Sequence, residues 1–212
     1  DHAFYNGRYY AYFGIVPCLL FQLPFEALTG IQNLAYAPCM VVLGLLLLAA
    51  CFGVVGQAVR RWFPQTSAAA YLLAVAAVVL GSQLYYLLVR PYIYEYAILC
   101  GAALLMLGLW LWLSAASTPV EKRGAILAKL AFGSLFAALV AGCRPQMELF
   151  AFLAVPIFWQ RYIGQKRLCS RAGAGEAAAF ILPVVVVAAG LMWYNAARFG
   201  SPLDFGANYN LT

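Results

Sequence analysis

The feature that most constrains this chain is a succession of apolar segments separated by short polar loops. Six such segments follow one another, over residues 35–59, 68–89, 92–114, 127–143, 146–160 and 177–197. A helix needs about 20 apolar residues to cross a bilayer. Only 9% of the residues are charged, against about 25% in soluble domains. The sequence therefore predicts an all-α, polytopic transmembrane protein with six spans in a lipid bilayer.

The stretch before the first clear span has a different character. Residues 1–11 have the composition of a loop, and residues 12–29 are apolar but interrupted by two prolines. Each proline removes a backbone donor that a continuous helix would use. Gln22 and Glu26 stand four residues apart, on one face of a helix. We therefore expect short helices that lie in the membrane interface and do not cross it.

The distribution of basic residues predicts the orientation. Loops 60–66, 115–129 and 161–175 contain nine of the 13 lysines and arginines. The other side contains the remaining four, Arg8, Arg90, Arg144 and Arg198. Nine against four places the first group in the cytoplasm. Both ends of the chain are then expected outside the cell membrane, together with five of the seven acids, Asp1, Glu26, Glu95, Glu148 and Asp204.

These observations divide the chain and exclude some functions. We expect an outer loop with interfacial helices (1–34), a six-helix transmembrane domain (35–198) and a second outer loop (199–212). Both ends lie within loop-like sequence without a signal peptide, so we expect a piece of a larger membrane protein. The basic residues form no solvated groove for nucleic acid. Six scattered cysteines and one histidine predict packing residues and no zinc site. No cofactor is indicated, and the sequence leaves the requirement for a divalent metal open.

Two of the outer connections share a motif in which an arginine precedes a proline and a glutamate follows. One motif runs from Arg90 to Glu95 and the other from Arg144 to Glu148. We expect each proline at the first helical position and each glutamate in the first turn, where the helix dipole favours an anion. The planar guanidinium matches phosphate oxygens, so both arginines are candidate phosphate ligands, and Arg144 is favoured by its small neighbours. The alternative is a helix cap with an Arg–Glu pair.

The first loop contains one carboxylate, Asp1, and the only histidine, His2. A carboxylate at a lipid–water boundary can serve as a general base, whereas the alternative is a solvated loop acid. We interpret His2 as a loop residue. Tyrosines are frequent on the outer side, among them Tyr9 and Tyr10. They form either an interfacial aromatic belt or a wall that lines a site for a sugar or a polyprenyl chain.

The stretch NGRYYAYFGIVPCLLFQLPFEALTG (6–30) resembles the outer-loop segment of GT-C-type membrane glycosyltransferases. This class includes mannosyltransferases and aminoarabinose transferases that use a polyprenyl-phosphate sugar. In the class, a loop aspartate precedes a basic, aromatic and proline-containing segment, and a glycine leads into the second transmembrane helix. Asp1, Gly7-Arg8, Tyr9-Tyr10, Pro17 and Gly30 follow that order. The tail YNAARFGSPLDFG (194–206) is similar to the loop after the seventh helix of many bacterial members.

The resemblance implies that the six spans correspond to helices two to seven of this module. Asp1 would be the general base that deprotonates an acceptor hydroxyl on a lipid, glycan or protein. That hydroxyl would attack the anomeric carbon of the polyprenyl-phosphate sugar with inversion, in a bacterial inner or plasma membrane. The expected substrate-binding residues are Arg8, Tyr9, Tyr10, Arg90, Glu95, Arg144 and Glu148. Two other classes stay open, a transporter or flippase for a lipid-linked precursor and a non-catalytic membrane subunit.

Overall fold

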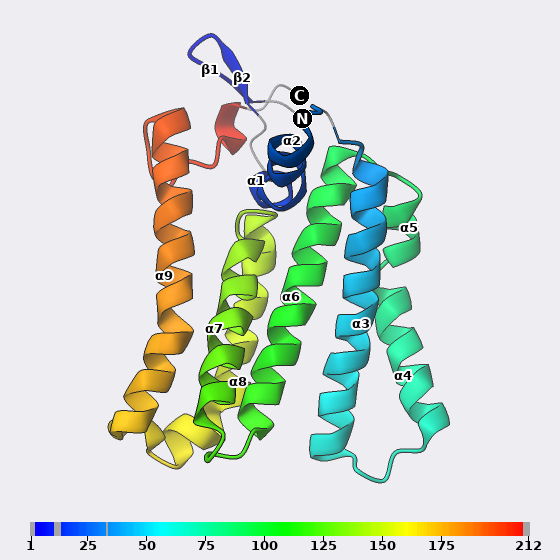
Figure 1. The fold of residues 1–212 in the computed structure, drawn as a ribbon, viewed down its shortest axis with the longest axis vertical. Coiled ribbons are helices and arrows are strands. Elements are labelled where there is room, and N and C mark those ends of the chain that lie inside the picture. The colour runs from blue at the N-terminus through cyan, green and yellow to red at the C-terminus, as the bar shows by residue number, and fades with distance from the viewer. Residues whose placement is uncertain (1–2, 11–13, 33, 210–212) are drawn as a thin grey trace.

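The computed structural model describes residues 3–10, 14–32 and 34–209 and is built almost entirely from helices (Figure 1). Four helices are long and apolar enough to cross a membrane, namely α3 (Tyr36–Trp62), α6 (Ile93–Ser117), α7 (Arg123–Val140) and α9 (Arg171–Phe199). They run side by side along the length of the molecule. The predicted all-α class is confirmed, and these helices are compatible with a multi-pass integral membrane protein.

The surface of α9 indicates the solvent around the bundle. None of the most apolar 18-residue window of this helix is buried inside the molecule. Leu182 is 63% exposed and Val186 is 61% exposed. A monomeric soluble protein rarely exposes a continuous apolar patch of this size. The exposed side of α9 therefore indicates a lipid bilayer.

The other two predicted spans, 68–89 and 146–160, are not single long helices, so six spans are not confirmed. The first is divided into α4 (Ala68–Gly81) and α5 (Leu84–Leu88) by a turn at Gln83, whose φ is 56°. The second consists of the 3₁₀ helix η2 (Pro145–Leu153), α8 (Ala154–Phe158) and the π-helical turn η3 (Trp159–Gly164). Both segments nevertheless run between the two ends of the bundle, beside α3 and α7 respectively (Figure 1).

The 3₁₀ helix explains how such a short segment extends so far. A 3₁₀ helix rises about 2.0 Å per residue, whereas an α-helix rises about 1.5 Å. The nine residues of η2 therefore cover about 18 Å, roughly 4 Å more than the same residues in an α-helix. The apolar pattern of residues 146–160 predicted one span and did not predict that the segment is divided into η2, α8 and η3.

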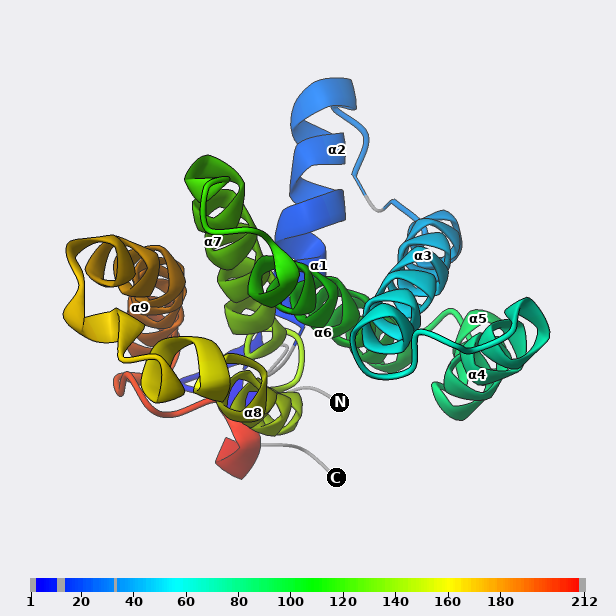
Figure 2. The ribbon, with the colours of Figure 1, turned by 90° about the horizontal axis from the view of Figure 1, so that it is seen from below.

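Helix α6 is the centre of the bundle, and Figure 2 shows it between α7 and α3. Its contact with α7 depends on two glycines: a Cβ on Gly108 would lie 2.9 Å from the Gly133 carbonyl oxygen. Small residues allow helix backbones to approach this closely in membranes. Beside this contact, the Trp112 indole Nε1 donates to Ser134 Oγ over 3.2 Å. On the α3 side, Trp110 occupies the space above Gly53.

The two ends of the bundle differ. One end carries the hairpin β1 (Ala3–Tyr5) and β2 (Arg8–Tyr10), α1 (Ile15–Pro17), the π-helical turn η1 (Cys18–Gln22), α2 (Leu23–Thr29) and the 3₁₀ turn η5 (Ala207–Tyr209). We call it the interfacial end, because α1 and α2 lie across the bundle there (Figure 1). The opposite end carries the connections 63–67, 118–122 and 165–170, with the short 3₁₀ helix η4 (Arg167–Cys169). We call it the basic end.

Candidate functional site

Arg144 is the centre of the candidate site at the interfacial end. It directly follows α7, and its amide donates to the Val140 carbonyl over 2.9 Å. Only 9% of the residue is exposed. The guanidinium lies 3.7 Å from the ring centre of Tyr94, which belongs to the first turn of α6. Arg144 therefore faces protein, and the tyrosine ring fixes the plane of its guanidinium.

The interfacial segment docks directly beside Arg144. The Val16 amide donates to the Gly142 carbonyl over 3.3 Å. A Cβ on Gly142 would lie 2.5 Å from Val16 Cγ2 and 3.1 Å from Leu191 Cδ2. Glycine is thus the residue that allows α1, α7 and α9 to meet at one point. Gly14, which has a φ of 77°, provides the turn that leads into α1.

The glutamates of the two motifs occupy the expected first turns, Glu95 in α6 and Glu148 in η2. Glu95 is buried and Glu148 is half-buried. Pro145 begins η2 as predicted, but Pro91 does not begin α6, because extended Tyr92 is the cap residue. Among the described residues the ion pair is Arg167–Glu176, so neither motif forms the Arg–Glu pair that was the alternative interpretation.

Arg90 has a different environment from Arg144. It is exposed, and its guanidinium donates to the Tyr86 hydroxyl and lies 5.2 Å from the centre of that ring. The bond to Tyr86 raises the pKa of Arg90 above its usual value. Tyr86 belongs to α5, on the far side of α3 from α7 (Figure 1). Arg90 is therefore a surface cation of the α5–α6 connection, and the structure does not bring it to Arg144.

The predicted residues of the first loop divide into two groups. Tyr10 packs edge-on against Phe199 at 5.5 Å between ring centres, so it anchors the hairpin to the end of α9. Tyr9 is 68% exposed and lies 5.0 Å from Phe4. Arg8 is exposed beside it. Asp1 and His2 lie outside the described residues.

A polar cleft beside α2 was missed in the sequence interpretation. Its volume is about 430 Å³. Its lining residues are Gln22, Glu26, Gln32, Leu34, Ala35 and Tyr36. Gln32 Nε2 donates to Glu26 Oε1 over 3.1 Å, and Gln22 Nε2 is buried without a hydrogen bond to the described residues. The spacing of Gln22 and Glu26 was the signal that could have identified this cleft.

Buried Tyr96 connects this cleft to the bundle. Its hydroxyl lies 3.0 Å from the Pro17 carbonyl oxygen and 3.1 Å from Gln22 Oε1. Tyr94, two residues earlier on α6, stacks on Arg144. The first turns of α6 thus hold both the guanidinium and the polar cleft in position. This arrangement presents the buried Arg144 and several amides at the same end of the bundle as the carboxylates of Glu26, Glu95 and Glu148.

A second arginine, Arg198, was not a predicted site residue. Its guanidinium lies 3.8 Å from the ring centre of Tyr194 and donates to Asn195 Oδ1 over 2.9 Å. Together with Gly142 and Pro145 it lines a small gap between α9 and the turn after α7. The sequence YNAARF could have predicted this contact, because Tyr194 stands four residues before Arg198 on the same helix.

The described residues offer no metal centre. No group of three or more histidine, cysteine or acidic side chains is arranged to hold a metal ion within that part of the chain. The five cysteines whose side chains the structure describes are free thiols, and four of them are buried. Their burial supports the interpretation of the cysteines as packing residues.

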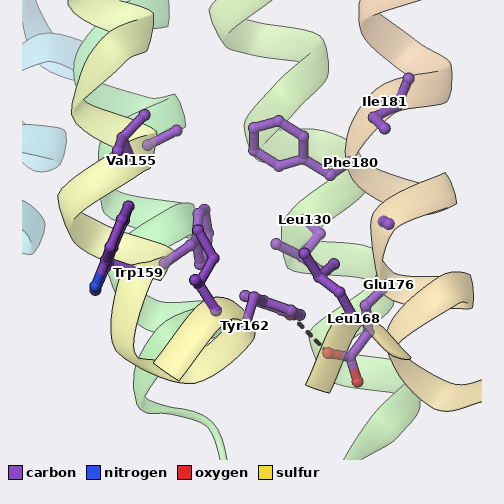
Figure 3. Close-up of a pocket in the computed structure, with 12 residues that line it drawn as sticks. Leu130, Val155, Trp159, Tyr162, Leu168, Glu176, Phe180 and Ile181 are labelled. Atoms are coloured by element: carbon purple, nitrogen blue, oxygen red, sulfur yellow. Dashed lines mark hydrogen bonds between the residues drawn. The ribbon is translucent and has the colours of Figure 1, made fainter. Parts of the chain in front are cut away.

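Figure 3 shows a separate cavity near the basic end, between α8, η3 and α9. Its volume is about 290 Å³, and its lining is almost entirely apolar. The Tyr162 hydroxyl donates to Glu176 Oε2 over 2.6 Å, and Arg167 Nη2 lies 2.5 Å from Glu176 Oε1. The polar groups of this cavity are thus already engaged with one another, which makes it a poor candidate for catalysis.

No protein-family model matches the chain, and neither the curated proteins nor the solved structures contain a match.

Proposed function

We propose that this chain is the membrane module of a GT-C-type glycosyltransferase. It would transfer a sugar from a polyprenyl-phosphate donor to an acceptor on the extracytoplasmic side. The observation that carries the proposal is Arg144, which is buried at 9% exposure and stacked on Tyr94 beside the docked α1. A guanidinium that is buried and fixed in plane suits a phosphate at membrane depth.

The proposed topology has six crossings, in which the interrupted segments 68–88 and 145–164 complete the four long helices. The nine cations of the basic end would then lie in the cytoplasm. The interfacial end would face the opposite side, where a lipid-linked donor and its acceptor can meet. This orientation follows from charge counting and from the alternating direction of the helices in Figure 1.

In the proposed reaction, an acceptor hydroxyl oxygen forms a bond to the anomeric carbon of the donor sugar. The bond between that carbon and the phosphate oxygen breaks, and its electron pair leaves with the polyprenyl phosphate. A carboxylate takes the proton of the hydroxyl, and we assign this role to Asp1. Inversion follows because the attack and the departure occur on opposite faces of the sugar.

Arg144 would stabilise the leaving phosphate, and Arg8 would meet the headgroup from the hairpin. The polar cleft of Gln22, Glu26 and Gln32 would hold sugar or acceptor hydroxyls, since amides and carboxylates offer both donors and acceptors. Exposed Tyr9 provides a face for a sugar ring. Arg90 would act at the surface, where it attracts the anionic headgroup before binding.

The test uses the full-length protein in proteoliposomes with labelled polyprenyl-phosphate mannose and polyprenyl-phosphate aminoarabinose. We expect Arg144→Gln to reduce sugar transfer by about 10²–10³-fold, the usual effect of removing one fixed donor to a developing charge. Asp1→Asn should abolish transfer. Arg171→Gln, an exposed cation at the other end, is the control. Wild-type transfer in both site variants, or no release of polyprenyl phosphate from either donor, would reject the proposal.

One observation favours a lipid-precursor transporter as the second candidate. Segments 68–88 and 145–164 are discontinuous, and transporters often build their sites from broken helices. However, the break at residues 82–83 carries no charge, and the Ser82 hydroxyl donates to the Val79 carbonyl over 2.7 Å. A transporter would move labelled lipid-linked sugar across the proteoliposome membrane without breaking the sugar–phosphate bond, which product analysis distinguishes.

A further inference from the structure

A polar cleft opens at the basic end, between the ends of α3, α6 and α7. Figure 2 shows these three helices side by side from that end. The cleft has a volume of about 860 Å³. Its basic lining residues are Arg60 and Arg61 from the last turn of α3 and Lys122 and Lys129 from the start of α7. Gln57, Ser114, Ser117 and Thr118 add neutral polar groups.

The charge in this cleft is of one sign. None of the described lining residues is acidic, and none of the four cations belongs to an ion pair in the part of the chain that the structure describes. Glu121, the nearest acid in sequence, is exposed and is not part of the lining. Arg61 Nη1 is buried without a hydrogen bond to the described residues. Four cations that line one cleft, one of them with a buried donor that no described residue accepts, favour an anion.

The end of α6 would normally weaken such a site, because its last carbonyl oxygens carry partial negative charge. Arg161 offsets this partial negative charge. Its Nη1 donates to the carbonyls of Ala115, Ala116 and Thr118 over 3.0, 3.2 and 2.9 Å.

The position of the cleft points to a membrane lipid. It lies where three apolar helices end, and Trp62, directly after Arg61, is 53% exposed, as expected of a side chain at the headgroup level. Basic pockets between transmembrane helices accept anionic headgroups. We propose that this cleft binds the phosphate headgroup of an anionic phospholipid, whose acyl chains follow the exposed apolar surface of α3. This proposal is independent of the transferase reaction at the interfacial end.

Lys129 gives the cleft a defined geometry. Its Nζ donates to Thr118 Oγ1 over 2.8 Å, and the Thr118 hydroxyl in turn donates to the Ser114 carbonyl over 2.7 Å. The ammonium is therefore held against the end of α6, and its other protons are directed away from Thr118. A phosphate bound between Lys129, Lys122 and Arg60 would be attracted by positive charges from both α7 and α3.

The experiment measures phosphatidylglycerol and phosphatidylcholine binding to the full-length protein by native mass spectrometry. The test variant is Arg60→Gln combined with Lys122→Gln. The matched control is Lys166→Gln combined with Arg171→Gln, which removes one lysine and one arginine from exposed positions at the same end. Each cation near an anionic lipid surface is worth about fivefold in binding. We therefore expect the test variant to lose roughly 25-fold in phosphatidylglycerol affinity, and the control to retain it.

Three outcomes would overturn the proposal. Equal phosphatidylglycerol binding in the test variant and wild type would show that the cleft is not the site. Displacement of the lipid by millimolar inorganic phosphate would identify a soluble phosphate as the ligand. A headgroup-photoreactive phosphatidylglycerol on the wild-type protein should label residues 57–62 and 114–129. This measurement needs no variant, and labelling confined to other segments would reject the site even if the variant fails to fold.

Discussion

Replacing Gly142 by alanine tests whether the docking of α1 organises the interfacial end. The added Cβ would lie 2.5 Å from Val16 Cγ2, about 0.9 Å inside the 3.4 Å at which ordinary contact begins, and Leu191 blocks the other side at 3.1 Å. Val16 is 1% exposed and has no free space into which to move. Overpacking of this kind costs about 1–3 kcal/mol. We expect the cost to appear as undocking of residues 14–29.

Hydrogen–deuterium exchange of the peptide covering residues 14–29 measures this directly. A cost of about 1–3 kcal/mol accelerates exchange through local opening by about 5–150-fold. Gly190→Ala is the matched control, because a Cβ there meets nothing within 4 Å. Adding Val16→Ala should restore much of the protection, since it removes the clashing methyl group, and the two substitutions should be non-additive. Unchanged exchange in Gly142→Ala, or additive effects in the double variant, would refute the docking argument.

Three further predictions concern the bundle. Glu176→Gln should destabilise the fold by about 2–4 kcal/mol, because it leaves Arg167 without its charge partner; an unchanged thermal midpoint in detergent would contradict this. Tyr96→Phe removes a buried hydroxyl that touches two acceptors on the interfacial segment, and hydrogen exchange there should rise in line with a loss of about 1–2 kcal/mol. Gly133→Ala would place a methyl group 2.7 Å from Trp112 Cδ1 and should cost about 1–3 kcal/mol in unfolding by denaturant, a result that equal stability would overturn.

The long helices were predictable because their apolar runs are continuous. Residues 35–59 predicted α3 to within three residues at each end, since hydrophobicity alone decides whether a segment avoids water. The division of residues 68–89 was not predicted. Gln83 adopts a left-handed conformation in the middle of an apolar run, where the apolar pattern itself gives no sign of a break. The amino-acid composition of this segment does not predict where the helix breaks.

The candidate site was likewise predictable from the sequence only in part. The motif around Arg144 identified a residue that is buried and stacked, because a charge next to a turn in an apolar chain must find a partner surface. The similar motif around Arg90 produced an exposed side chain, since the tertiary neighbour is Tyr86 of the preceding helix. The sequence predicted that Glu26 shares a helix face with Gln22, because the two residues stand four positions apart. The partner that turns this pair into a cleft, Gln32, lies beyond the helix and required the fold.

The contact between Arg161 and the end of α6 has a consequence for biosynthesis. The guanidinium binds carbonyls that lie 43 to 46 residues earlier in the chain. While the ribosome is still making that intervening stretch, the α6–α7 hairpin has to satisfy those carbonyls with water at the membrane surface. The hairpin can therefore enter the bilayer early but cannot complete its lower end until η3 has been synthesised. Truncation of the nascent chain before residue 161 should leave this end hydrated and accessible to water-soluble probes.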